Sequence, residues 1–398
     1  RIAAYKVCWN SDYVSPEGVE ERGCFGADSM AAIDAAVADG VDVINYSISG
    51  SRTSLTPPQT AAMLRATNAG VFVSVSAGNS GTAPVTVGTP APWVTSVAAS
   101  TYDGISYTNS IEIVSRDPAE KLLSTEGSIT KPLSEYGNVT AKVVIAEPLL
   151  GCFDGQPSPL DNAAEIADNI ALIKRGTCNF SDKIERAQLA GAKAVVVYSD
   201  DRPVTVMGGN GAYDIPGVMI NGADGDALNI AISGGEEVTI KMSAGSFEQQ
   251  TEVGNIMADF SSRGPNGNTE DLIKPDITAP GVRILAGISS APMFGPQGES
   301  YGYLSGTSMS APHIAGMAAL LKGQHPSWSP AQVKSALMTT ARQNVVVMHD
   351  ENENVISPIP ATPFNFGSGH AVPVSAMEPG LTYDLNAGDY FGFMCGQD

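Results

Sequence analysis

Residues 302–320 read GYLSGTSMSAPHIAGMAAL, and they present one serine where a nucleophile would stand. The tight turn Gly306-Thr307-Ser308 leads into a long Ala-rich apolar run, which predicts a helix with Ser308 in its first turn. Pro312 is expected in a first turn, because proline is tolerated there and rarely deeper. The unpaired N–H groups and positive dipole end of such a helix favour a developing anion. The alternative is a Ser/Thr cap on an ordinary core helix.

The composition is that of an acidic chain with ample material for a core. Its 398 residues are 43% hydrophobic, enough for two or three domains. The net charge of −20 argues against nucleic acid and anionic membranes as partners. No apolar run reaches the roughly 18 residues of a membrane span, and no signal peptide opens the sequence. Because Arg1 leads directly into a β-rich run, residues 2–7, we expect a mature or truncated product.

The first hundred residues alternate β-rich and helical patterns. Residues 28–39 have apolar positions at helical spacing and stop at Gly40, and residues 57–68 begin with proline and stop before Gly70. β-rich runs are expected at residues 2–7, 41–47, 71–76 and 94–99. Apolar strands that alternate with helices predict an α/β fold with a doubly wound parallel sheet, covered on both faces.

From about residue 101 the pattern changes, and a β-rich block follows. It contains ALIKRGTCNFSDKIERAQLAGAKAVVVYSD, residues 171–200, and then IPGVMI, residues 215–220. The α/β pattern resumes at residue 256, so we expect a domain inserted into the first one. The predicted boundaries are 1–115, 116–250 and 251–398. The Gly-rich loop at 208–211 lacks the Lys-Ser/Thr of a phosphate-binding loop, which favours a turn.

Five cysteines are present, and none lies in a CxxC pair that would indicate a zinc ribbon or a thioredoxin-like site. Cys8 with Cys24, and Cys152 with Cys178, could each close a local loop. If oxidised, each such disulfide would stabilise the fold by about 3 kcal/mol in the chain-entropy model. The alternative is buried free thiols. Cys395 is left over, and its partner is expected outside this chain.

The run SGTSMSAPH around Ser308 resembles the active-serine motif of the subtilisin-like serine peptidases (subtilases). Further segments resemble the same family in the same order. They are FSSRGP, PDITAPG, HPSWSPAQVKSALMTTA and FGSGHAVPVSAMEPGLTYDL, and together the matches cover nearly the whole chain. The β-rich block resembles a protease-associated (PA) domain, which implies the PA-containing branch known from plant and bacterial secreted enzymes. The resemblance implies a secreted, extracellular serine endopeptidase with protein or peptide substrates.

The resemblance also assigns roles to individual residues. Ser308 would be the nucleophile, and its backbone N–H and the side-chain amide of Asn79 would stabilise the oxyanion. The segment DVINYSISG resembles the strand that pairs with an extended substrate, although the family usually has glycine at the position of Ser49. The remaining expected substrate-binding residues are Ser47 and Ile48 on that strand, Ser76, Ala77 and Gly78 as a wall of the primary pocket, and Gly88 as its floor. Small residues there imply an open, apolar pocket that admits large side chains.

The motifs that resemble the family do not include the histidine that would act as general base for Ser308. The four histidines are His313, His325, His349 and His370, and none occurs in the family's histidine motif, nor does its aspartate motif occur. We therefore expect the His/Asp partners on a missing N-terminal segment and a nearly inactive chain without it. The competing interpretation is a catalytically dead relative that binds proteins through its PA domain.

No cofactor or metal is assigned from the sequence. Acidic loops at residues 200–201 and 350–351 could bind calcium, but solvated surface charge explains them better. Asn138-Val139-Thr140 and Asn179-Phe180-Ser181 are glycosylation sequons, which matter only in a eukaryotic secretory host. Substrate preference and oligomeric state have no sequence signal.

Overall fold

The structure is a computed structural model that describes residues 1–14, 20–81, 83–153, 157–200, 204, 206–208, 212–289, 300–350 and 356–397. The chain divides into two compact units. The first unit comprises Arg1–Gly104, Glu252–Ile284 and Tyr303–Asp398, and the second comprises Ile105–Thr251 and Leu285–Gly302. Short strands β15 (Ile284–Gly287) and β16 (Tyr301–Leu304) lie where the chain passes between them.

The first unit is built on a four-stranded parallel sheet in the order β14-β5-β4-β3. These strands are β3 (Val43–Tyr46), β4 (Phe72–Ser76), β5 (Thr95–Ser100) and β14 (Ile277–Pro280). Register pairs Tyr46 with Val75 and Ser76 with Val97, so β3, β4 and β5 end at the same edge. All five residues of β4 are buried, as expected for a central parallel strand covered on both faces.

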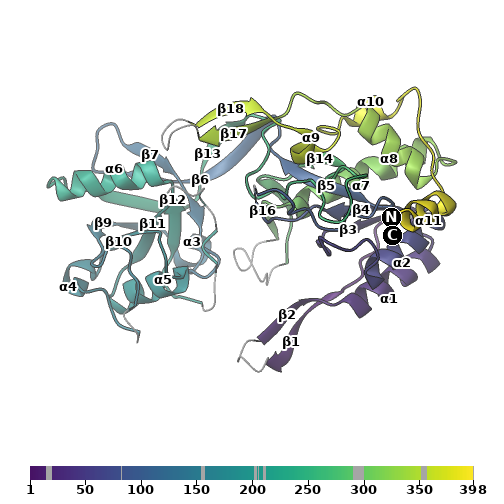
Figure 1. Ribbon diagram of the computed structural model, residues 1–398. Coiled ribbons are helices and arrows are strands. Elements are labelled where there is room, and N and C mark those ends of the chain that lie inside the picture. The colour runs from purple at the N-terminus through teal and green to yellow at the C-terminus, as the bar shows by residue number, and fades with distance from the viewer. Residues whose placement is uncertain are drawn as a thin grey trace. The chain divides into compact units, whose positions relative to one another are not determined.

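Helices cover both faces of this sheet (Figure 1). They are α1 (Gly26–Ala38) and α2 (Pro58–Asn68) on one face, and α7 (Thr307–Gln324) and α8 (Pro330–Thr339) on the other. Successive side chains of a strand point to opposite faces. Val73 and Val75 accordingly pack with Met63 of α2, whereas Phe72 packs with Ile314 of α7. The predicted doubly wound α/β sheet is confirmed.

Residues 1–7 form no strand, so the strand expected at 2–7 is wrong. A strand needs a neighbour to satisfy its N–H and C=O groups, and the described sheet ends at β3. The strand begins instead at Cys8, in an antiparallel hairpin of β1 (Cys8–Val14) and β2 (Glu20–Cys24). A Cys8–Cys24 disulfide joins its two ends. The C-terminal part adds β17 (Val346–Asp350), β18 (Ile356–Pro360), α9 (Pro363–Phe366), α10 (Pro373–Ala376) and α11 (Ala387–Cys395).

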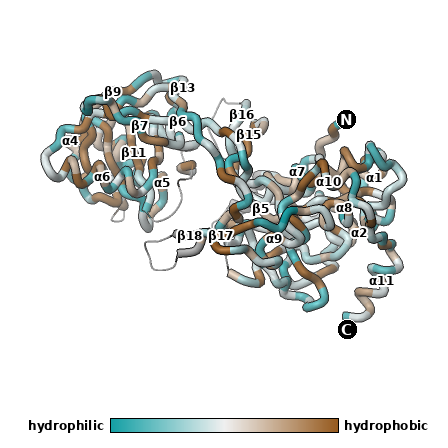
Figure 2. The backbone as a smooth tube through the Cα atoms, turned by 90° about the horizontal axis from the view of Figure 1, so that it is seen from above, coloured by the Kyte–Doolittle hydropathy of each residue, from teal (hydrophilic) through white to brown (hydrophobic). Residues whose placement is uncertain are grey.

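The second unit contains an eight-stranded mixed sheet in the order β7-β6-β13-β9-β10-β11-β12-β8. Strands β9 to β12 are parallel, and the outer ones are antiparallel. Its elements are β6 (Gly104–Ile113), β7 (Glu120–Leu123), β8 (Thr125–Glu126), α3 (Leu133–Tyr136), β9 (Val139–Ile145), α4 (Ala163–Ile166), β10 (Ile170–Lys174), α5 (Phe180–Leu189), β11 (Ala194–Tyr198), β12 (Gly217–Ile220), α6 (Gly222–Ser233) and β13 (Thr239–Glu252). Hydrophobic residues run along β11 in Figure 2, and all five of them are buried.

Arg186 of α5 and a disulfide hold the loop that follows β9 in the second unit. The Cys152–Cys178 disulfide joins this loop to the start of α5. Arg186 of α5 is almost fully buried and donates to the backbone oxygens of Cys152 and Pro159 and to the carboxylate of Asp161. Cys395 is unpaired and exposed. Among the described residues, no helix is long and apolar enough to cross a membrane.

Candidate active site

Helix α7 presents Ser308 as its second residue, directly after Thr307. Gly306 precedes the helix in an extended conformation, so the N–H of Ser308 is one of the first-turn donors that have no intrahelical acceptor. Pro312 lies deeper than the first turn in which it was expected. Since proline has no N–H, it cannot donate to the carbonyl of Ser308, four residues earlier. That carbonyl needs another donor.

Ser47 is that donor. Its hydroxyl donates to the carbonyl oxygen of Ser308 at 2.8 Å, which satisfies the group that Pro312 leaves unpaired. In return, the Ser308 hydroxyl donates to the carbonyl oxygen of Ser47 at 3.1 Å. Two residues that are 261 positions apart in sequence are therefore joined by a reciprocal pair of bonds. The pair holds the expected nucleophile against the residue that follows β3.

Asn79 lies next to this pair, just beyond the carboxyl end of β4. Its side-chain oxygen Oδ1 accepts from the backbone N–H of Thr307 at 2.9 Å and from the Thr307 hydroxyl at 2.8 Å. The Thr307 hydroxyl in turn accepts from the N–H of Gly78 at 3.2 Å. These contacts assign Oδ1 as the acceptor and leave the Nδ2 amide as a donor. A Cβ on Gly306 would lie 3.4 Å from Nδ2, so the amide group is beside the start of α7.

The expected pocket residues also come together at this edge of the sheet. The N–H of Gly88 donates to the carbonyl of Ala77 at 2.8 Å, and the hydroxyls of Ser49 and Ser76 lie 3.4 Å apart. Ile48 lies half-buried between Ser47 and Ser49. The carboxyl ends of parallel strands are the usual place for a ligand in an open α/β sheet.

Two glycines among the expected pocket residues have no room for a side chain. Gly78 has a φ of 110°, and a Cβ there would lie 2.8 Å from the Ser262 hydroxyl. A Cβ on Gly88 would lie 2.9 Å from the carbonyl oxygen of Gly50. The glycines therefore allow the wall and floor segments to approach each other closely.

The histidines are engaged elsewhere. Nδ1 of His313 bonds the Met309 carbonyl at 2.8 Å, and Nε2 of His325 bonds the Met377 carbonyl at 3.0 Å. Nδ1 of His370 bonds the carbonyl of the next residue, and burial lowers the pKa of this imidazole. His349 lies in β17, and its side chain is outside the described residues. Among the described side chains, no imidazole is hydrogen-bonded to Ser308.

The possible calcium loops are only partly described, since residues 201 and 351 lie outside the described ranges and the side chain of Asp350 is not described. Within the described ranges, no group of three His, Cys, Asp or Glu residues could hold a metal ion.

A buried ion network at the start of β14 was not expected from the sequence. Asp276 accepts from Lys274 at 2.5 Å and from Lys334 at 2.8 Å, and the N–H of Ser96 adds a third bond at 2.7 Å. The two ammonium groups also donate to backbone oxygens of residues 91–94, just beyond Gly88. Burial lowers the pKa of Lys274 to about 7. For Asp276, burial opposes ionisation, but the two ammonium groups outweigh it and lower its pKa.

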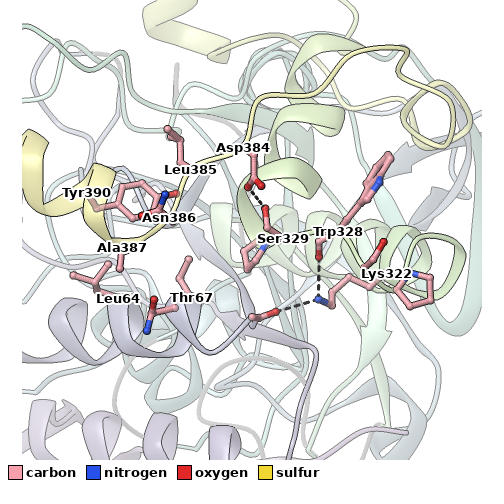
Figure 3. Close-up of a pocket in the computed structure, with 15 residues that line it drawn as sticks. Leu64, Thr67, Lys322, Trp328, Ser329, Asp384, Leu385, Asn386, Ala387 and Tyr390 are labelled. Carbon is pink, nitrogen blue, oxygen red and sulfur yellow. Dashed lines mark hydrogen bonds between the residues drawn. The ribbon is translucent and has the colours of Figure 1, made fainter.

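A pocket of ≈ 360 Å³ lies at the other end of α7 (Figure 3). Lys322 points into it and donates to the carbonyls of Gly70 and Trp328, and Asp384 accepts from the Ser329 hydroxyl. Its charged groups bind neighbouring protein atoms, as expected where α2, α7, α8 and the segment before α11 meet. It contains none of the expected catalytic residues.

Comparison with known proteins gives consistent results. The subtilase family profile matches residues 2–369. The chain is similar to Subtilisin-like protease SBT5.4 of Arabidopsis thaliana, at 37% identity over 99% of this chain and 50% of that protein. It is also similar to Subtilisin-like protease SBT1.5 of the same plant, at 34% identity over 99% of this chain and 51% of that protein. The chain therefore spans about half the length of the curated relatives it matches.

Among solved structures, the chain is similar to the psychrophilic subtilisin-like protease Apa1 from Pseudoalteromonas sp. AS-11. The match covers 87% of this chain and 72% of the other, at 20% identity and a TM-score of 0.38. A likeness this weak supports no conclusion.

Proposed function

Because this chain belongs to the subtilase family, we propose that it carries the nucleophile and the oxyanion donors of a serine endopeptidase that cleaves proteins and peptides. The observation that supports this best is the contact between Thr307 and Asn79 at the start of α7. This contact supports a role for the Asn79 amide and the N–H of Ser308 as two donors beside the Ser308 hydroxyl. A substrate carbonyl approaching that hydroxyl would meet both donors.

The reaction starts when the Ser308 hydroxyl leaves the Ser47 carbonyl and attacks the substrate carbonyl carbon. The hydroxyl proton goes to a general base, and the carbonyl oxygen becomes an oxyanion that accepts from the Ser308 N–H and from Asn79 Nδ2. Collapse of this intermediate breaks the C–N bond, and the amine leaves with the proton. Water then gives a proton to the base and attacks the ester on Ser308. The Ser308 oxygen leaves and takes that proton, which releases the acid product and restores the hydroxyl.

The base and the carboxylate that orients it would come from a segment outside these 398 residues, because none of the four histidines lies in the family's histidine motif and the three described imidazoles bond backbone carbonyls elsewhere. A catalytically dead protein-binding relative remains the second candidate. The intact Ser308, Thr307 and Asn79 contacts favour the enzyme, since a binding scaffold has no need of an oriented amide beside a serine.

We also propose that residues 116–250 form a PA domain and that the protein is secreted. The parallel strands β9 to β12, with α5 after the RGTC segment, support the first assignment. The two disulfides support the second, because disulfides persist mainly in oxidising compartments.

The test is labelling of the full natural protein that carries these residues with a fluorophosphonate, followed by peptide mass mapping. We expect the phosphonyl group on Ser308 and no labelling in Ser308→Ala. Ser310→Ala is a matched control, because the Ser310 hydroxyl is buried two residues away and lacks a hydrogen-bond partner in the described structure. Peptide binding without labelling or turnover would instead support the dead scaffold.

A further inference from the structure

Arg52 lies at the end of the expected substrate strand and reaches across to the other wall of the pocket. Its guanidinium Nη2 donates to the hydroxyl of Ser80 at 2.5 Å. Ser80 directly follows Asn79, so this cation lies one residue from the proposed oxyanion donor. Both Arg52 and Ser80 are exposed. The contact connects the far ends of the segments that contain Ser47 and Ser76.

The backbone on both sides of Arg52 is held in place. The carbonyl of Ser51 accepts from the N–H of Thr89 at 2.8 Å, next to the floor residue Gly88. The carbonyl of Thr53 accepts from the side-chain amide of Asn268 at 3.0 Å. The base of the Arg52 side chain is therefore positioned before any ligand arrives, which reduces the entropy cost of a contact.

The charge of Arg52 has no carboxylate partner among the described residues. Arg65 contacts Asp34, Arg116 contacts Glu120 and Glu236, Arg186 contacts Asp161, and Arg283 contacts Glu252. Arg263 and Arg342, like Arg52, have no such ion pair in the described structure, but no described hydrogen bond brings either guanidinium beside the expected pocket residues. In a chain of net charge −20, an arginine without such a partner beside a pocket is a distinctive feature. A guanidinium that donates one N–H to a hydroxyl retains further donors for a carboxylate, and the planar fork suits that group best.

We propose that Arg52 recognises an acidic side chain, Asp or Glu, on the substrate residue that supplies the scissile carbonyl. The inference rests on the proposed peptidase function and makes its substrate class specific. Ser80 follows the expected wall segment of Ala77 and Gly78, and Arg52 follows the expected substrate strand, so their contact sets a cation beside the expected pocket. The expected open apolar pocket thus becomes a pocket with a cationic end.

The experiment compares the full natural protein on peptide pairs that differ only at that residue, Glu against Gln. We expect kcat/KM to favour Glu about 10- to 100-fold, the range for a hydrogen bond to a charged group. The preference should fall as salt rises, because Arg52 is exposed. Arg52→Gln should abolish the Glu/Gln ratio, Arg52→Lys should retain part of it, and Arg52→Glu should shift the preference toward Lys.

Arg65→Gln is the matched control, since Arg65 is an exposed arginine on α2 and its only described ion pair is with Asp34. It should leave the ratio unchanged. A wild-type protein that cleaves both peptides equally, or an Arg52→Gln protein that still prefers Glu, would overturn the inference while leaving the peptidase intact. Failure of fluorophosphonate to label Ser308, with no cleavage of either peptide, would instead refute the proposed function.

Discussion

Thr307 donates both its backbone N–H and its hydroxyl to one atom, Oδ1 of Asn79. A primary amide held by two bonds to its oxygen cannot rotate about its side-chain torsion without losing them. Its Nδ2 group is thus fixed beside the start of α7. Orientation of this kind is what electrostatic preorganisation requires.

The first prediction concerns this contact. Thr307→Val keeps the backbone N–H but removes the hydroxyl, which donates to Asn79 and accepts from the N–H of Gly78. We expect kcat to fall about 5- to 10-fold through the loss of the bond to Asn79. KM should change little, because the oxyanion exists only beyond the ground state. Thr307→Ser should restore kcat. The measurement is steady-state kinetics of the three proteins on one peptide. A rise in KM of the same size, with kcat unchanged, would show that Thr307 acts on substrate binding instead.

The second prediction concerns Ser47 and Pro312. Ser47→Ala leaves the Ser308 carbonyl without its donor, which should lower the free energy of unfolding by about 1–3 kcal/mol. Pro312→Ala supplies an N–H in the helix for the same carbonyl. The cost of Ser47→Ala should therefore be smaller in the Pro312→Ala background, as measured by urea unfolding of all four proteins. Strict additivity of the two substitutions would contradict this account.

The third prediction concerns Gly88. Gly88→Ala places a Cβ 2.9 Å from the Gly50 carbonyl oxygen, at the expected floor of the proposed pocket. We expect kcat/KM to fall at least about tenfold for a substrate with a large side chain in the pocket, and less for alanine there. Gly316→Ala is the control, because a Cβ on this helix residue meets nothing within 4 Å. An equal fall in kcat/KM for both substrates would show that Gly88 does not line the pocket.

The fourth prediction concerns pH. Burial lowers the pKa of Lys274 to about 7 from 10.5. Between these values the unfolded chain binds a proton that the folded chain lacks, so stability from this group rises with pH from about 7 to 10.5. Lys274→Met should remove that rise when urea midpoints are compared with wild type across the range. Lys142→Met, at an exposed lysine paired with Glu237, should not.

Asp276 gives the fifth prediction, at acid pH. Its pKa is lowered from 3.8, so its contribution is present above that value and is lost as pH falls through the folded-state pKa. Asp276→Asn removes the carboxylate that binds the buried Lys274 and the partly buried Lys334, and we expect a loss of about 3–5 kcal/mol near neutral pH. The measurement is the unfolding midpoint of wild type and variant between acid and neutral pH. A difference that stays constant throughout would contradict the assignment.

Local patterns were sufficient for much of the fold. The 3.6-residue spacing at residues 28–39 and the apolar runs at 71–76 and 94–99 became α1, β4 and β5. The same reasoning was wrong at residues 2–7, because a strand exists only with a neighbouring strand and composition says nothing about neighbours. It also placed Pro312 one turn too early, because the donor that makes a deeper proline tolerable is Ser47, far away in sequence.

The sequence by itself determined the family, the alternation of strands and helices, and Ser308 at the start of a helix, since each depends on residues that are close along the chain. Tertiary structure alone decided how these parts meet. It brought the Ser47 hydroxyl to the Ser308 carbonyl, two lysines to Asp276, and the Arg52 guanidinium to Ser80. Apart from Lys274 and Asp276, which are two residues apart, these contacts join positions well separated in the chain, so the bonds exist only where the fold brings those positions together.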